Sequence, residues 1–174
     1  RPHAPTQAAP DPQLQQFEDR FDPRVFVEAR LPGLPHAGVL TTPVFMTRYP
    51  TTATNRNRAR SRVVYNSFLA TNVLELAQRP ISAVSPIHNP TLNDPQCNVC
   101  HSVIDPVAGA LQNWNARGGY EVLDAWYPEM VPPGFGDEML PQEARTRGAS
   151  WLAERIVSDR RFDRAIVRWM FKAI

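Results

Sequence analysis

Cys97-Asn98-Val99-Cys100-His101 contains both cysteines of this 174-residue chain. The spacing Cys-x-x-Cys-His is typical of covalent haem attachment, in which two thiols bond to the two vinyl groups of one haem and the imidazole ligates its iron. The pentapeptide therefore predicts one covalently bound haem c. Cys97 and Cys100 are the expected attachment residues, and His101 is the expected axial metal ligand.

Other uses of the same residues require features that this sequence lacks. A structural zinc site commonly has a second pair of Cys or His ligands at similar spacing, and no second pair is present. A thioredoxin-like redox motif is expected beside a βαβ pattern, which the flanking Pro-rich sequence does not have. A disulfide across two intervening residues closes a very small loop and adds little stability. Haem attachment is the best interpretation.

The composition favours a helical domain with irregular connections. Eighteen prolines stand against eight glycines, and frequent proline divides a chain into short elements joined by rigid turns. We expect a mainly α fold with long Pro-rich loops, namely a cytochrome c-like haem domain with an extended N-terminal arm. The net charge of +2 does not indicate nucleic-acid binding, and no apolar stretch approaches the roughly 20 residues of a membrane span.

The chain divides into three regions. Residues 1–30 are rich in Pro, Gln and Ala and predict the extended arm. Residues 31–93 predict a segment of helix and loops ahead of the motif, and residues 94–174 predict the haem-binding domain. The sequence begins at Arg1 without an initiator Met or a recognisable signal peptide, and its last helical run reaches Ile174 without a stop signal. We therefore expect a processed product or a fragment of a longer chain.

Capping signals predict two helices near the motif and one before it. The earlier helix is expected to begin at Thr54 or Asn55 and to end near Leu69 or Ala70. Asp94-Pro95 is a typical N-cap and first position for the helix that carries the motif, and Asp105-Pro106 is expected to interrupt it. A second helix would then restart at Pro106. Its apolar side is the expected wall of the haem crevice: Val107, Ala110, Leu111 and Trp114.

The rest of the chain predicts a long loop followed by a helical end. Residues 115–148 are rich in Gly and Pro and are expected to form a loop under the haem edge. A helical region should begin near Ala149, break at Ser158-Asp159 and resume over residues 163–171. The residues of this last helix expected to face the core are Ile166, Val167, Met170 and Phe171.

Four arginines alternate along the expected first helix, at Arg56, Arg58, Arg60 and Arg62. Because alternate positions fan around a helix, the simpler interpretation is a solvated polar surface whose stems cover apolar neighbours. The other interpretation is recognition of an anion, either the haem propionates or an acidic patch on a redox partner.

The sixth ligand of the iron has several candidates. Met130 stands in an aromatic and Pro-rich loop, and Met139 lies in Asp-Glu-Met-Leu-Pro just ahead of the terminal helix. Methionine paired with histidine would raise the reduction potential of the haem. His88 would instead give bis-histidine coordination. Weaker candidates, with core or loop positions, are Met46, Met170, His3 and His36.

Longer stretches of the chain resemble one known family. They are the extended motif from Cys97 to Trp114, the following Gly118-Gly119-Tyr120, and two upstream stretches, residues 38–46 and 55–60, together with residues 151–162. The chain is similar to the C-terminal cytochrome-like modules of large exported bacterial proteins, the Planctomycete-type cytochrome c proteins, whose domains are mainly of unknown function. The resemblance spans roughly residues 38–170.

This resemblance implies a haem site and a sixth ligand. It carries over Cys97, Cys100 and His101 as haem-binding residues, and it favours Met130 over Met139 because the aromatic-Met-Pro-Gly-Phe loop is similar to that of the family. Since haem c is attached outside the inner membrane, a periplasmic or extracellular location is expected.

Electron transfer through a single haem is the leading functional hypothesis, with a redox partner protein or other subunits of a larger complex as partners. An enzyme is the rival: an open iron could bind peroxide or a small gas, with His88 or Arg117 on the distal side. A third hypothesis is a structural haem-bearing subunit of a larger assembly. Aromatic residues are expected to pack around the haem: Trp114, Tyr120, Trp126 and Tyr127.

Overall fold

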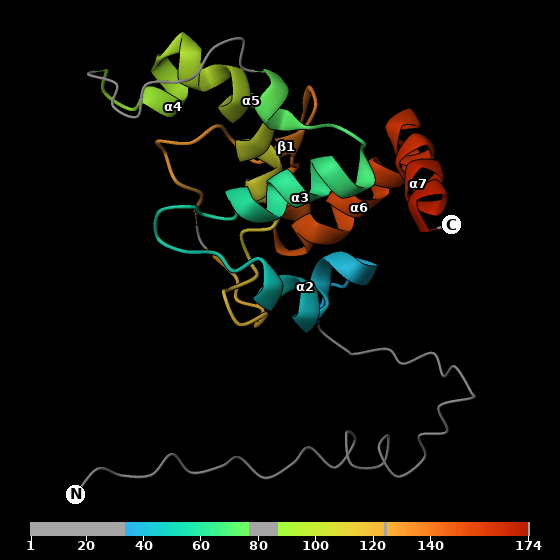
Figure 1. Cartoon of the computed structure of the whole chain (residues 1–174). Coiled ribbons are helices and arrows are strands. Elements are labelled where there is room, and N and C mark those ends of the chain that lie inside the picture. Colours follow the sequence, from blue (N-terminus) through green and yellow to red (C-terminus); the bar gives the residue numbers. More distant parts are fainter. Residues whose placement is uncertain (1–33, 77–86, 124, 174) are drawn as a thin grey trace, which may run out of the picture. The chain divides into compact units, whose positions relative to one another are not determined.

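Figure 1 shows the computed structural model of the chain, which describes residues 34–76, 87–123 and 125–173. The predicted arm of residues 1–30 lies outside these ranges. Residues 34–174 form one compact unit, and the predicted boundary between residues 93 and 94 falls inside it. This unit is mainly helical, which confirms the predicted fold class at that level. None of the helices in the described ranges is long and apolar enough to span a membrane.

The elements of the unit are mostly short. Helices α3, α5, α6 and α7 are the longest, and the strands β1 and β2 form one antiparallel hairpin in which Gly134 pairs with Met139. In chain order the elements are the 3-10 helix η1 (Gly38–Thr41), α2 (Pro43–Arg48), α3 (Arg58–Phe68), the 3-10 helix η2 (Val73–Leu76), α4 (Pro90–Asn93), α5 (Pro95–Ala110), β1 (Gly134–Phe135), β2 (Glu138–Met139), the 3-10 helix η3 (Gln142–Arg147), α6 (Gly148–Ser158) and α7 (Arg160–Ala173).

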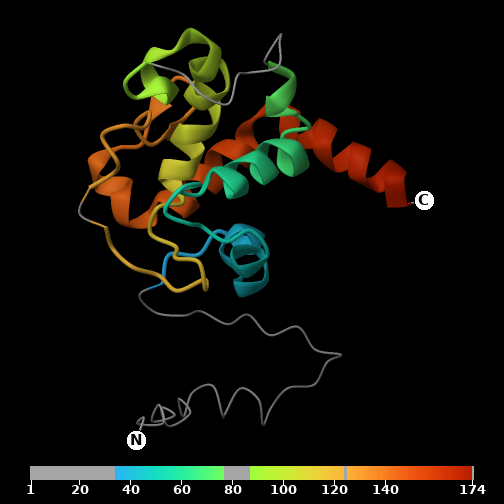
Figure 2. The ribbon, with the colours of Figure 1, turned by 60° about the vertical axis from the view of Figure 1, so that its left-hand side comes forward.

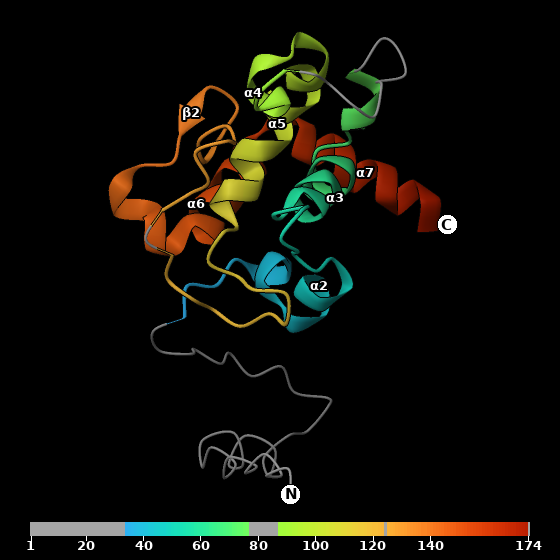
Figure 3. The same ribbon diagram turned by 90° about the vertical axis from the view of Figure 1, so that its left-hand side faces the viewer.

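Helix α5, which carries the Cys-x-x-Cys-His motif, contacts α3, α4, α6, β1 and η2 (Figure 3). It begins as predicted, because the Asp94 carboxylate accepts a hydrogen bond from the Gln96 amide (2.8 Å) and Pro95 occupies the first helical position. The predicted interruption at Asp105-Pro106 is wrong, since α5 is one helix through Pro106. Proline there removes one backbone hydrogen bond. Residues 106–111 are all buried, and their packing outweighs that loss.

Helix α3 begins later than predicted. The expected start at Thr54 or Asn55 is wrong because Asn57, directly before the helix, adopts a left-handed conformation (φ 68°) that helices do not continue through. The Asn57 side-chain amide instead donates to the Leu111 carbonyl (3.3 Å) at the end of α5. The inward residues are Val64, Tyr65 and Leu69, all buried, with Phe68 half-buried.

The long loop predicted for residues 115–148 contains regular structure. The β1–β2 hairpin forms within it, because Gly136 takes a positive φ of 59° and lets the chain reverse between Phe135 and Glu138. The η3 helix follows directly after the hairpin. The prediction of one uninterrupted loop is therefore wrong, although both strands are only two residues long.

The helical end of the chain has the predicted break and a different buried face. Asp159 separates α6 from α7, as expected. Ala165 is buried, Phe162 packs on the core, and Trp169 donates its indole N–H to the Ser67 carbonyl (2.8 Å), so the face of α7 that they share lies against the unit. Figure 2 shows α7 projecting from the other helices. The predicted core residues of α7 are exposed, by 39% to 77%: Ile166, Val167, Met170 and Phe171.

Gly109 in α5 permits the close approach of the loop that contains Met130. A Cβ atom at this position would lie 2.7–2.9 Å from Cγ, Cβ and Cα of Pro133, closer than real contacts allow. Gly109→Ala is therefore expected to lower the free energy of unfolding by about 1–3 kcal/mol, the usual cost of overpacking. Urea unfolding followed by circular dichroism measures this loss. Gly38→Ala is the comparison, because nothing lies within 4 Å of the Cβ position there, although its positive φ adds a cost of its own. A Gly109→Ala variant with the same free energy of unfolding as the wild type would show that the loop containing Pro133 moves to make room for the added methyl group.

Candidate functional site

Cys97, Cys100 and His101 lie within one 100° arc of helix α5, because positions i, i+3 and i+4 of a helix share a face. Both thiols are free. Cys97 is half-buried, whereas Cys100 is buried and donates a weak hydrogen bond to the Val73 carbonyl in η2 (3.4 Å). Burial raises the pKa of the Cys97 thiol, as do the nearby Asp94 and Cys100. The Cys97 side chain is therefore a thiol at neutral pH.

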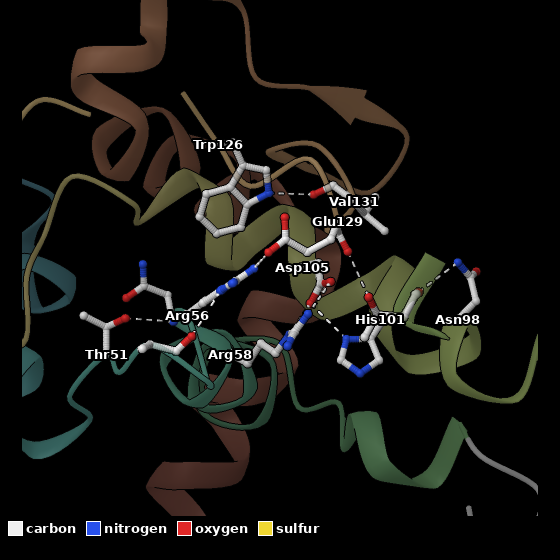
Figure 4. A network of polar contacts seen from close by, with 12 residues as sticks. Thr51, Arg56, Arg58, Asn98, His101, Asp105, Trp126, Glu129 and Val131 are labelled. Atoms are coloured by element: carbon white, nitrogen blue, oxygen red, sulfur yellow. Dashed lines mark hydrogen bonds and ion pairs between the residues drawn. The ribbon is translucent and has the colours of Figure 1, made fainter. Parts of the chain in front are cut away.

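The imidazole of His101 is held by one of its two nitrogens. Its Nδ1 lies 3.0 Å from Oδ1 of Asp105, one helical turn further along α5 (Figure 4). No described residue makes a hydrogen bond to Nε2, and the side chain retains 22% of its exposure. An ionised carboxylate only accepts hydrogen bonds, so Nδ1 carries a proton, and in the neutral imidazole the Nε2 lone pair is available to a metal ion.

Asp105 is held in turn by Arg58 of helix α3. The guanidinium donates from Nε to Oδ1 (2.7 Å) and from Nη2 to Oδ2 (3.0 Å), a two-pronged contact with a carboxylate that is fully buried. Burial alone would raise the pKa of Asp105. The hydrogen bonds from His101 and Arg58 and the charge of Arg58 outweigh it and lower that pKa below its ordinary value, so the carboxylate is ionised at neutral pH.

Apolar side chains are exposed on η2 and on α5, the helix that carries the motif. Val99 of α5 and Leu74 and Leu76 of η2 are between 40% and 55% exposed, and η2 contacts α5. Val73 of η2 accepts the hydrogen bond from Cys100, so the two leucines lie on an element beside a thiol, whereas Val99 lies on the side of α5 away from Cys97 and His101.

Met130 lies in a loop that is fastened to the motif helix. The Thr91 hydroxyl donates to the Glu129 carbonyl (3.0 Å), and the Thr91 carbonyl accepts from the Asn98 side chain in α5 (3.3 Å). Trp126 closes the loop by donating its indole N–H to the Val131 carbonyl (3.0 Å; Figure 4). Met130 is buried, with 3% exposure, yet it is not part of the main hydrophobic core.

The other candidate ligands have different surroundings. Met139 in β2 is 68% exposed, and His88 is exposed. Met46 is fully buried in the main core, whereas Met170 is exposed on α7. His36 is exposed, and His3 lies outside the described residues.

Trp114 is buried at the far end of α5 from the thiols. About 14 Å of helix axis separate His101 from the end of α5 at Ala110, and Trp114 follows that end. Its ring packs edge-on against Tyr120. It also lines a cavity of about 190 Å³ with Trp126 and Tyr127. The structure thus brings Trp114, Trp126 and Tyr127 together around this cavity, and Tyr120 packs on Trp114.

The alternating arginines are not a solvated surface, with one exception. Arg60 is fully buried, Arg58 binds Asp105, and Arg56 pairs with Glu129 while its guanidinium lies 4.0 Å from the centre of the Tyr127 ring. Only Arg62 is exposed. The anion partners of Arg56 and Arg58 are carboxylates of this chain, so the simpler sequence interpretation is wrong for three of the four residues.

The pairing of Asp105 with Arg58 was missed at the level of sequence. Asp105 stands four residues after His101, a spacing that places two side chains on the same helix face and could have indicated the contact. Arg58 lies 47 residues before Asp105, and no spacing rule connects them. Among the described residues, no group of three His, Cys, Asp or Glu side chains could hold a metal ion.

Fold and site together define a mainly helical domain with a Cys-x-x-Cys-His motif near the start of its longest helix. Residues 36–124 match the model of PSCyt3, described as a protein of unknown function (DUF1588), and the chain belongs to that family. The match includes the motif and the arginines of α3, whereas Met130, α6 and α7 lie beyond it. No curated protein and no solved structure matched the chain.

Proposed function

We propose that this domain transfers electrons through one haem c attached to Cys97 and Cys100. The observation that carries the proposal is the state of His101, whose Nδ1 is fixed by Asp105 while Nε2 remains without a described partner beside two free thiols. The exposed Leu74 and Leu76 of η2 support it, because η2 lies beside Cys100 and a porphyrin would cover apolar side chains there. The abbreviation Cyt in the family name agrees with it. Iron in such a group gains and loses one electron without a bound substrate.

The residues of the chain have three tasks in this proposal. The thiols of Cys97 and Cys100 would hold the haem covalently, and Nε2 of His101 would bind its iron. Asp105 fixes the orientation of the imidazole, as outer-shell carboxylates commonly do for metal-binding histidines. Met130 would be the second protein ligand of the iron, because its thioether is buried in a loop fastened to α5.

A buried methionine in a loop fastened to the motif helix favours an electron carrier over an enzyme with an open iron. The partners we propose are a redox protein or other subunits of a larger complex. We also propose a periplasmic or extracellular location, because haem c is attached outside the inner membrane.

Haem content tests the proposal directly. The chain is produced in the bacterial periplasm together with the haem-attachment machinery, and intact mass and the absorption of the pyridine complex are measured. We expect one haem per chain, and its loss when Cys97→Ser and Cys100→Ser are combined. Ser102→Ala, an exposed position of the same helix, should leave haem content unchanged. A folded wild-type chain without added mass would overturn the proposal.

A further inference from the structure

Asp105 stands between an imidazole and a guanidinium, and both neighbours donate hydrogen bonds to its carboxylate. Its Oδ1 accepts hydrogen bonds both from His101 Nδ1 (3.0 Å) and from Arg58 Nε (2.7 Å), while Oδ2 accepts from Arg58 Nη2 (3.0 Å). The same oxygen therefore serves both residues. The interaction of Oδ1 with the Arg58 guanidinium therefore weakens the hydrogen bond that the same oxygen accepts from His101 Nδ1.

Burial makes this competition strong. Asp105 has no exposed side-chain surface, whereas Arg58 and His101 keep 20% and 22% of theirs. Inside a protein the effective dielectric constant is about 4–20 instead of 80, so charges separated by one hydrogen bond influence each other far more than in water. A carboxylate on Nδ1–H makes the imidazole a stronger donor to a metal ion. A guanidinium on the same carboxylate weakens that effect.

We infer that Arg58 and Asp105 together set the reduction potential of the haem iron, Asp105 lowering it and Arg58 raising it through the shared carboxylate oxygen. This inference rests on the proposed function and assigns both residues as positioning and tuning residues that do not touch the haem themselves. A stronger imidazole donor favours the ferric state, and so does uncompensated negative charge near the iron. The two residues thus act in opposite directions although they form one ion pair.

Opposite shifts are the test, because a merely structural role would disturb the site in one direction. In the haem-loaded protein, Asp105→Asn is expected to raise the midpoint potential and Arg58→Met to lower it, measured by spectroscopic titration with redox mediators. We expect each substitution to change the ferric-to-ferrous ratio at a fixed potential about tenfold, which is ~59 mV for a one-electron couple.

Two further variants protect the test against general effects. Arg62→Met removes an exposed charge one turn further along α3 and should leave the potential near that of the wild type. Breaking a buried ion pair from one side is destabilising, so a single variant could fail to fold. Combining Asp105→Asn with Arg58→Met removes both charges, and its potential should lie between those of the single variants. Shifts of the two single variants in the same direction, or a double variant outside their range, would overturn the inference.

The nitrogen signals of His101 separate this inference from the proposed function. In ¹⁵N NMR spectra of the purified chain, we expect the proton on Nδ1 in the wild type and a mixture of tautomers in Asp105→Asn. This measurement needs no haem. A chain that takes up no haem but shows the Nδ1 proton would overturn electron transfer and leave the orienting role of Asp105 standing. A haem-loaded chain in which Asp105→Asn and Arg58→Met do not shift the midpoint potential in opposite directions would overturn this inference and leave the proposed electron transfer standing.

Discussion

Replacing Arg60 by methionine is expected to lower the free energy of unfolding by about 3–5 kcal/mol, a large share of the stability of a domain of this size. Arg60 has no exposed surface, and its guanidinium donates to the Tyr49 carbonyl (2.8 Å), the Met46 carbonyl (3.1 Å) and the Asn115 carbonyl (2.6 Å). It also donates to the Trp114 carbonyl and the Asn57 side chain. These acceptors belong to three separate segments of the chain.

The expected loss comes from the acceptors and not from an ion pair. Burial lowers the pKa of Arg60 to about 10, so the guanidinium is still charged at neutral pH. Its five described partners are four carbonyl groups and one amide oxygen, with no carboxylate among them. Methionine fills a similar volume without any donor. Each buried acceptor left without a partner lowers the free energy of unfolding by about 1–3 kcal/mol. The total loss is smaller where neighbouring groups rearrange and provide a new donor.

Urea unfolding measures this loss, with Arg62→Met as the control because it removes the same charge from an exposed position of the same helix. Arg60→Lys should lose nearly as much, since an ammonium group cannot reach acceptors spread over three segments. An Arg60→Met variant within 1 kcal/mol of the wild type would show that the carbonyl groups find other donors.

Local signals in the sequence predicted the start of α5 and the break between α6 and α7, whereas the predicted start of α3 and the predicted interruption of α5 are wrong. Asp94-Pro95 starts α5, and Asp159 separates α6 from α7, because capping and chain-breaking residues act within a few positions. The continuation of α5 through Pro106 depends on the burial of the residues that follow it. The exposed face of α7 could not be predicted, because periodicity finds an apolar face without showing what covers it.

The sequence predicts the haem-attachment residues of the candidate site, but it does not predict the ion pair that holds His101 in place. The spacing of Cys97, Cys100 and His101 is contained in five residues and needs no fold to be recognised. Arg58 and Asp105 meet only because α3 packs on α5, so the charge balance at His101 is a property of the fold. The burial of Arg60 has the same origin, and alternation along the helix suggested the opposite.

Substitution of Met130 is expected to change the coordination of the iron in the haem-loaded protein, whereas substitution of Met139 is not. The wild type should have a low-spin spectrum that does not change when carbon monoxide is added. Met130→Ala should have a high-spin spectrum that shifts on the same addition. Loss of the thioether should also lower the midpoint potential, because methionine coordination raises it. The reason for choosing Met130 is its burial at 3% exposure, against 68% for Met139.

Absorption spectra of the ferric and reduced protein, with and without carbon monoxide, decide between the two methionines. Met139→Ala is the matched control, since it removes the same thioether from an exposed strand and leaves the loop fastened to α5 by Thr91 intact. An open iron in Met139→Ala, with Met130→Ala unchanged, would reverse the assignment and require the β1–β2 hairpin to fold over the haem. If both variants remain low-spin, neither methionine is the ligand, and His88→Ala becomes the variant that should open the iron.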